Sequence, residues 1–259
     1  MSSGPESLPL AERVLRHERA VLAASIVLLA ALAWGWTLNG AGLLGLPMDD
    51  MPGMPRAPSP GGVFILLMMW WIMMVAMMLP SAAPAILLFG RVRQQRGQAA
   101  NIGASWIFLA GYLLAWLLVC AVATTVQLLA TGAGLVDGMT MRATSPLLAG
   151  AALIATGLYQ LSPIKDACLT NCRSPASFLA RHWRPGAGGA LRLGLLHGAY
   201  CIGCCWLLMT LLFVGGVMNF GWIAALTALV AAEKLSLGGR TLSRAAGLVL
   251  VLWGMARLL

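Results

Sequence analysis

The sequence predicts an all-α protein, a polytopic bundle of transmembrane helices with its N-terminus in the cytoplasm. Composition is the first reason. Sixty per cent of the 259 residues are apolar and 10% are charged, whereas a soluble domain carries about 25% charged residues. So few charges cannot cover a globule of this size, which excludes an ordinary soluble protein and a disordered chain. The second reason is that the apolar residues form long runs, as a lipid bilayer requires.

Seven apolar runs are candidate spans, because a bilayer core takes about 20 helical residues. The last two are short, so six spans is the fallback. The first run ends in Ala31-Leu32-Ala33, which resembles a signal-peptide cleavage site. The long segment before it and Trp34 after it favour a retained anchor instead. The seven runs cover residues 20–38, 62–90, 102–130, 146–161, 193–214, 222–237 and 245–258.

The distribution of basic residues sets the orientation of the chain, and it is the third reason to predict a bundle of transmembrane helices. With the N-terminus inside and seven spans, fourteen Lys and Arg residues fall inside and three fall outside. This bias follows the positive-inside rule and places the whole net charge of +9 on the inner side. Anionic lipid headgroups therefore explain the basic character without nucleic acid. The inside residues are Arg13, Arg16, Arg19, Arg91, Arg93, Arg96, Lys165, Arg173, Arg181, Arg184, Arg192, Lys234, Arg240 and Arg244, and the outside ones are Arg56, Arg142 and Arg257.

We therefore expect a multi-pass protein of the bacterial cytoplasmic (inner) membrane, in contact with membrane lipids. Residues 1–19 form a cytoplasmic segment and residues 20–259 a single transmembrane domain. Two loops stand out in that domain. The outer loop, 40–61, is rich in Met and Pro, and the inner loop, 162–192, is basic and carries two cysteines.

Five of the six cysteines lie at the inner side of this predicted topology. Three of them open the fifth span and, on a helix, share about 100° of one face with His197. Thiolates and one imidazole suit a soft metal, which is Cu(I), Zn(II) or an iron–sulfur centre. A disulfide would need an oxidising compartment, and plain packing of small residues is the other alternative. The candidate metal ligands are Cys168, Cys172, His197, Cys201, Cys204 and Cys205.

Methionine forms a second pattern, with fifteen residues in the chain. Met69, Met73 and Met77 are spaced by four, so they form a stripe along the second span, and Met209 of the fifth span is a further candidate for this relay. Thioethers are soft ligands for Cu(I), although methionine is also a flexible core filler. The outer loop adds a candidate capture site made of Met48, Asp49, Asp50, Met51 and Met54.

Three further residues are candidates for gating or structure. Pro80 interrupts the second span and frees backbone groups, as the broken helices of transporters do. Glu233 and Lys234 close the sixth span, either as a pair that ends the helix or with the acid lining an ion pathway. The sequence has no phosphate-binding loop, no Ser/His/Asp constellation and no paired catalytic carboxylates, so we expect no enzyme.

These motifs together resemble a bacterial family of predicted metal-binding integral membrane proteins, some of whose members are labelled copper chaperone. The resemblance covers about residues 60–236 in order. It implies a helical membrane protein tied to metal handling, above all of copper. The motifs that carry it are MMVAMMLP (73–80), YQLSPIK (159–165) leading into Cys168 and Cys172, HGAYCIGCCW (197–206), GGVMN (215–219) and Glu233-Lys234.

Our main hypothesis is a protein that binds Cu(I) and takes it up or delivers it through the methionine relay to the inner Cys/His site. Its partner would be a soluble copper chaperone or a metalloenzyme being assembled. A second hypothesis is a membrane assembly factor or accessory subunit with a structural zinc. That ion, bound by Cys168, Cys172, His197 and one of Cys201 or Cys204, would pin the inner loop to the fifth span. A third is a membrane thiol oxidoreductase.

Overall fold

The computed structural model describes residues 10–39, 59–96, 102–138 and 140–259, and it confirms the all-α class. Five helical stretches are long and apolar enough to cross a membrane: Ala20–Asn39, Pro60–Arg93, Gly103–Gly132, Gly186–Gly215 and Gly239–Leu258. They belong to helices α1 (Leu10–Asn39), α2 (Pro60–Gln95), α3 (Ile102–Gly132), α7 (Gly186–Thr210) with α8 (Leu212–Gly215), and α10 (Gly239–Leu258).

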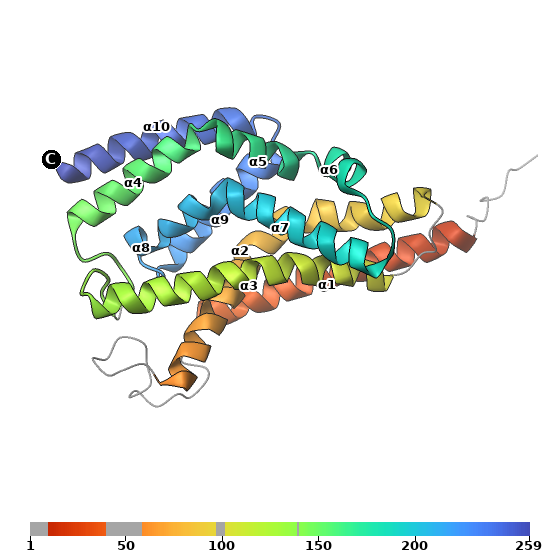
Figure 1. Ribbon diagram of the computed structural model, residues 1–259, viewed down its shortest axis with the longest axis horizontal. Helices are drawn as coiled ribbons and strands as arrows, with labels where there is room; N and C mark the ends of the chain where they lie inside the picture. Colours follow the sequence, from red (N-terminus) through yellow and green to blue (C-terminus); the bar gives the residue numbers. More distant parts are fainter. Residues whose placement is uncertain (1–9, 40–58, 97–101, 139) are drawn as a thin grey trace, which may run out of the picture.

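The remaining predicted spans are shorter or broken. Helix α4 (Pro146–Gln160) is followed by α5 (Pro163–Arg173), and the two pass the same test only as a pair bent by 64°, which gives up to six spans. Helix α9 (Phe220–Leu235) has 16 residues. The seven expected spans thus correspond to five long helices, one bent pair and one short helix. Figure 1 shows that α1, α3 and α7 run in the same direction along the long axis of the molecule.

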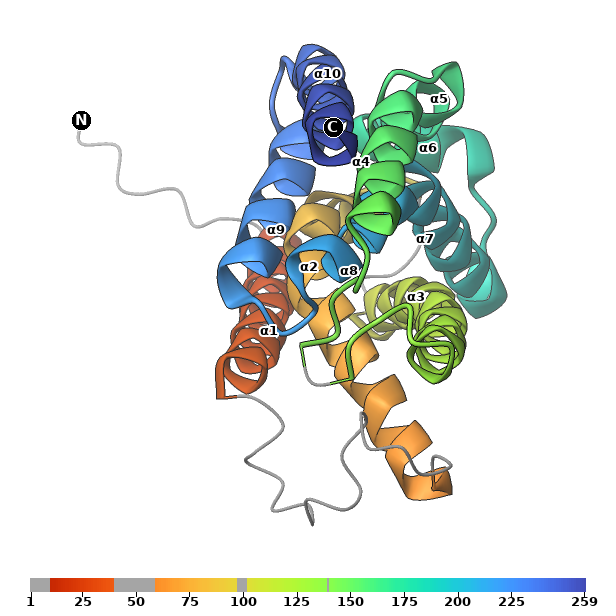
Figure 2. The ribbon, with the colours of Figure 1, turned by 90° about the vertical axis from the view of Figure 1, so that its left-hand side faces the viewer.

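Small residues set the distances between helices in two places. Helices α4 and α10 lie side by side along one side of the bundle (Figure 2). A Cβ added to Gly157 of α4 would lie 2.6 Å from the carbonyl oxygen of Gly247 in α10, so the two backbones are in contact, as in membrane helix pairs of this kind. On the other side, Gly194 of α7 lies directly on the backbone of Phe108 in α3.

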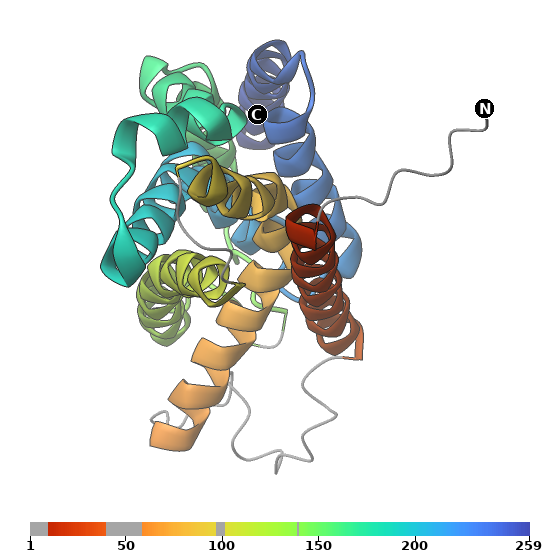
Figure 3. The ribbon, with the colours of Figure 1, turned by 90° about the vertical axis from the view of Figure 1, so that its right-hand side faces the viewer.

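Helix α2 changes direction midway, as Figure 3 shows. Pro80 and Pro84 lie inside it, and each removes the N–H that would bond a carbonyl one turn earlier. The carbonyl of Met78, next to this break, accepts hydrogen bonds from Ser81 Oγ at 2.9 Å and from Tyr112 Oη of α3 at 3.3 Å. The break is therefore stabilised by side chains, and it lies beside the cysteines described below.

Most of the segment 162–192, expected as a loop, is helical. Ser162 caps the start of helix α5, because its Oγ accepts a hydrogen bond from the Lys165 N–H at 3.2 Å. Pro163 is the first residue of the helix. Helix α6 (Pro175–His182) follows directly. Serine before proline is a helix start signal, so the sequence carried this information. As a result, Cys168 and Cys172 lie one turn apart on a rigid helix and not on a loop.

Candidate functional site

The three cysteines of α7 lie on its buried face, each with 1% of its surface exposed. Cys204 and Cys205 are one turn beyond Cys201, and their thiols donate to its carbonyl oxygen at 3.1 Å and 2.9 Å. Helix α7 begins at Gly186, earlier than the predicted span. Cys201 is therefore fifteen residues beyond the helix start, which is about 22 Å along the axis. The cysteines lie deep in the bundle and not at its inner surface.

Helix α5 brings two further cysteines to this face of α7. Cys172 Sγ lies 3.9 Å from Cys204 Sγ. Cys168 covers Gly203, where an added Cβ would lie only 2.7 Å from its Sγ. The hydroxyl of Tyr159, at the end of α4, donates to the carbonyl of Gly203. The missing side chain at Gly203 thus allows α5 to pack closely enough to pair the two sulfur atoms.

Helices α2 and α3 add a thioether and a hydroxyl to the cysteines of α7. Met78 Sδ lies 3.9 Å from Cys205 Sγ. Tyr112 Oη lies 3.2 Å from Cys201 Sγ, while it also donates to the Met78 carbonyl. We call the group Met78, Cys172, Cys201, Cys204 and Cys205 the sulfur cluster.

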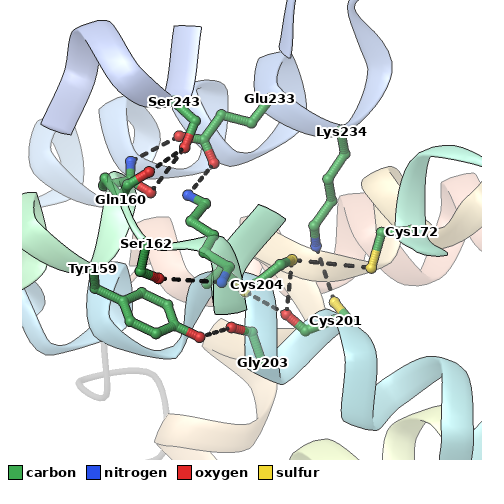
Figure 4. A network of polar contacts seen from close by, with 12 residues as sticks. Tyr159, Gln160, Ser162, Cys172, Cys201, Gly203, Cys204, Glu233, Lys234 and Ser243 are labelled. Carbon is green, nitrogen blue, oxygen red and sulfur yellow. Dashed lines mark hydrogen bonds and ion pairs between the residues drawn. The ribbon is translucent and has the colours of Figure 1, made fainter. Parts of the chain in front are cut away.

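A buried ammonium group touches the sulfur cluster (Figure 4). Lys234, in the last turn of α9, is 6% exposed. Its Nζ lies 2.9 Å from Cys201 Sγ, 3.9 Å from Met78 Sδ and 3.3 Å from Ser81 Oγ. These three contacts use all three N–H donors of the ammonium.

The neighbouring acid belongs to a separate buried network. Glu233 Oε2 lies 2.6 Å from Lys165 Nζ, and Glu233 Oε1 accepts from Gln160 Nε2 at 2.7 Å. Ser243 of α10 extends the network by donating to Gln160. The network therefore ties α4, α5, α9 and α10 together around a buried ion pair. Lys165 and Lys234, which the topology prediction counts among the inner basic residues, are both buried in the bundle.

His197 lies on the same side of α7 but among aromatic rings. Its ring centroid is 5.3 Å from that of Phe178, 5.8 Å from Tyr112 and 6.0 Å from Phe108. Its Nδ1 is buried and has no hydrogen-bond partner among the described residues. The structure therefore shows the predicted imidazole packed against rings, whereas four of the five predicted thiols lie in sulfur contacts.

The sulfur atoms are arranged in pairs. Within the described ranges, no group of three or more His, Cys, Asp or Glu side chains could hold a metal ion. Metal–sulfur bonds of about 2.3 Å place two ligand sulfurs from about 3.8 Å apart in a tetrahedral site to about 4.6 Å apart in a linear one. The two sulfur pairs, each at 3.9 Å, lie within this range. Because no third donor of these types joins either pair among the described residues, each pair offers two soft ligands and not a closed four-ligand zinc site.

The other predicted residues have different positions. Met69, Met73 and Met77 are buried in α2, and Met209 is buried near the end of α7. Pro80 lies at the break of α2. The candidate capture residues Met48, Asp49, Asp50, Met51 and Met54 lie outside the described residues. The relay and capture roles therefore stay predictions.

Sequence reasoning missed three buried residues, two at the sulfur cluster and one in the neighbouring ion-pair network. Tyr112 and Lys165 were not singled out, and Met78 was left outside the predicted relay although it contacts Cys205 and Lys234. The sequence does contain a signal for Lys165. This isolated lysine follows a Ser-Pro helix start, so it is expected on a helix of an apolar domain. Burying a charge in such a domain costs free energy, so charged residues there usually have a function.

Comparison with known proteins agrees with the chemistry of the sulfur cluster. The model of the PpoB2 family, described as "Copper chaperone", matches residues 67–257. The match includes the break of α2, the cysteines of α5 and α7, and Lys234. No curated protein and no solved structure matches the chain.

Proposed function

Because the chain belongs to the PpoB2 family of copper chaperones, we propose that it is a membrane-embedded carrier of Cu(I) and that the sulfur cluster is where the ion binds. Copper is the cargo in this proposal and the protein is not an enzyme. The ion is received on one side of the bacterial cytoplasmic membrane and passed to a soluble copper chaperone or to a metalloenzyme being assembled.

The contact between Cys172 and Cys204 is the single observation that carries the proposal. Their sulfurs, on different helices, are 3.9 Å apart and close to three more sulfur atoms. Cu(I) is a soft ion that prefers thiolate and thioether ligands. Two thiolates are enough to hold it, while Cys201, Cys205 and Met78 offer alternative partners. A site with exchangeable sulfur ligands suits a carrier, which has to release its ion.

The break of α2 supports a route into the cluster. Met78 lies two residues before Pro80 and contacts Cys205. The methionine stripe of Met69, Met73 and Met77 precedes it on the same helix and leads toward the predicted outer side. Broken helices are common at the binding sites of transporters, where they expose backbone groups to the ligand. We therefore propose that copper passes along α2 toward Cys205.

Metal content of the purified protein tests the proposal. The full chain, solubilised in detergent after growth with copper and zinc, is compared with the variant Cys172→Ser/Cys204→Ser by inductively coupled plasma mass spectrometry. We expect copper in the wild type and its loss in the double variant. The control is Cys120→Ala, which removes the buried thiol of α3, eight residues from Tyr112 along that helix. We expect this control to keep its copper.

Two results would contradict the proposal. Copper retained by the double variant would remove the sulfur cluster as its site. Zinc in place of copper, lost in the double variant, would instead favour the structural zinc clip of an assembly factor.

A further inference from the structure

Lys234 is a buried cation that has no carboxylate partner among the described residues. Ion pairs in the described part of the chain join Lys165 to Glu233, and Arg240 and Arg244 to Asp166, but none includes Lys234. Its Nζ contacts two sulfur atoms and one hydroxyl oxygen. Burying a charge is costly unless it is paired. The groups that can supply a negative charge in direct contact with this ammonium are therefore thiolates of the sulfur cluster.

The adjacent acid does not offset this charge. Glu233 precedes Lys234 in the chain, but consecutive residues point about 100° apart on a helix. Both oxygens of Glu233 are occupied, one by Lys165 Nζ at 2.6 Å and the other by Gln160 Nε2 at 2.7 Å. The Lys165–Glu233 pair is neutral as a whole. Among the described residues, the sulfur cluster therefore lies beside one positive charge that only its own thiolates are in contact to balance.

That charge changes which metal completes the site. Cu(I) with two thiolates carries one negative charge, so the complex and Lys234 together are neutral. A divalent ion with two thiolates is already neutral and leaves the ammonium unpaired in a buried site, which is unfavourable. A third thiolate on one ion would restore the balance, but the described residues hold no group of three such donors around one position.

From this charge balance, we propose that Lys234 is the residue that makes the sulfur cluster selective for monovalent soft cations, Cu(I) and Ag(I), over divalent cations of similar softness. The proposal rests on the proposed function, since it assumes that the cluster binds metal. It extends that function by assigning the selectivity to one side chain that is not itself a metal ligand.

A competition between Ag(I) and Cd(II) tests the assignment, because both ions favour sulfur and they differ in charge. The detergent-solubilised full chain, with its thiols reduced and under nitrogen, is given equal amounts of both ions. Bound metal is counted by mass spectrometry. We expect the wild type to prefer Ag(I). In Lys234→Gln we expect the Ag:Cd ratio to fall by about tenfold or more, because a unit charge a few ångströms away acts strongly in a protein interior.

Two variants separate charge from shape. Lys234→Arg keeps the charge, and we expect it to keep most of the preference for Ag(I). The double variant Lys165→Gln/Glu233→Gln removes the neighbouring ion pair without changing the net charge, and we expect it to keep the wild-type ratio. Thermal unfolding and elution volume establish whether each variant is folded.

The outcomes distinguish this inference from the proposed function. A folded Lys234→Gln variant with an unchanged Ag:Cd ratio overturns the role of Lys234 while copper binding stands. If that variant does not fold, a wild type that takes up Cd(II) as readily as Ag(I) overturns it equally. A wild type that binds neither Cu(I) nor Ag(I) overturns both proposals.

Discussion

At the scale of single residues, the site depends on side chains that connect helices. Tyr112 is the clearest example, because its hydroxyl contacts Cys201 Sγ of α7 at 3.2 Å and donates to the Met78 carbonyl of α2 at 3.3 Å. It is fully buried. One oxygen atom of α3 thus fixes the positions of a thiol and of the broken segment of α2 relative to each other.

The variant Tyr112→Phe tests this role. Removing the hydroxyl deletes both contacts and leaves Cys201 with fewer buried partners, so we expect a loss of about 1 kcal/mol in the free energy of unfolding and weaker Cu(I) binding. Unfolding in detergent and competition with a Cu(I) chelator measure the two effects.

The matched control is Tyr200→Phe, on α7 beside Cys201. No hydrogen bond of the Tyr200 hydroxyl is present in the described part of the chain, so we expect little change. Equal effects in the two variants would contradict the role of Tyr112.

At the scale of helices, the pairing of α5 with α7 creates the contact between Cys172 and Cys204. Gly203 is the position where they approach, since Cys168 occupies the space of its missing side chain. A rigid helix transmits a displacement at Cys168 to Cys172, which lies one turn further along. The separation of the two sulfur atoms is therefore controlled from a position that contributes no ligand.

The variant Gly203→Ala tests this control of the sulfur separation. Its Cβ would lie 2.7 Å from Cys168 Sγ, closer than van der Waals contact, so the Cys168 side chain has to shift, and we expect α5 to move outward with it. We expect several-fold weaker Cu(I) binding, measured by competition with a chelator. The matched control is Gly188→Ala in the same helix, where an added Cβ would have no neighbour within 4 Å. That control should bind copper as the wild type does.

A second substitution identifies the cause of the Gly203→Ala effect. Adding Cys168→Ala removes the sulfur atom that the new methyl group meets, so we expect it to restore most of the copper affinity. If the double variant binds as weakly as Gly203→Ala alone, steric displacement of α5 is not the reason for the loss.

At the scale of the whole molecule, the sequence was sufficient for the helices and insufficient for the contacts between them. Runs such as 62–90 and 102–130 are apolar over more than the thickness of a bilayer core, and they become the long helices α2 and α3. The cysteines of α7 and α5 were also assigned together as candidate metal ligands, which requires their two segments to pack against each other. These features follow from the composition and from the 3.6-residue period of the helix, and both can be determined from the sequence alone.

The charge environment of the site could not be derived in the same way. Lys234 lies 33 residues from Cys201 along the chain, and its contact with the thiol depends on where the short helix α9 ends. The sequence placed it only at the inner end of a span, as a candidate for gating or for ending the helix. His197 was placed with the thiols by helical periodicity alone, which gives a direction and no distance. Both positions were decided by packing between helices.

The arrangement of helix ends leads to a prediction about the whole chain. Figure 1 shows the start of α1 at the end of the bundle opposite to the C-terminus. The loop after α3, which contains Asp137 and Arg142, lies at the same end as the C-terminus. The end of α2 and the start of α7 lie toward the other end (Figure 1). Because Arg91 and Arg93 belong to that part of α2 and Arg184 lies two residues before α7, the positive-inside rule assigns this end to the cytoplasm. This arrangement requires that the bent pair of α4 and α5 and the short helix α9 each act as one crossing.

Reporter fusions at the two ends of the chain test the arrangement. We expect a fluorescent protein at the N-terminus to mature, because that end is cytoplasmic, and alkaline phosphatase after Leu259 to be active, because it folds only outside. A phosphatase fusion after Gly134 serves as the positive control on the outer side, and one after Arg184, between α6 and α7, as the negative control.

An inactive phosphatase after Leu259 with both controls behaving as expected would favour six spans. Helix α9 or the bent pair would then enter and leave the membrane on the same side, and copper would reach the sulfur cluster through a re-entrant segment and not between complete spans.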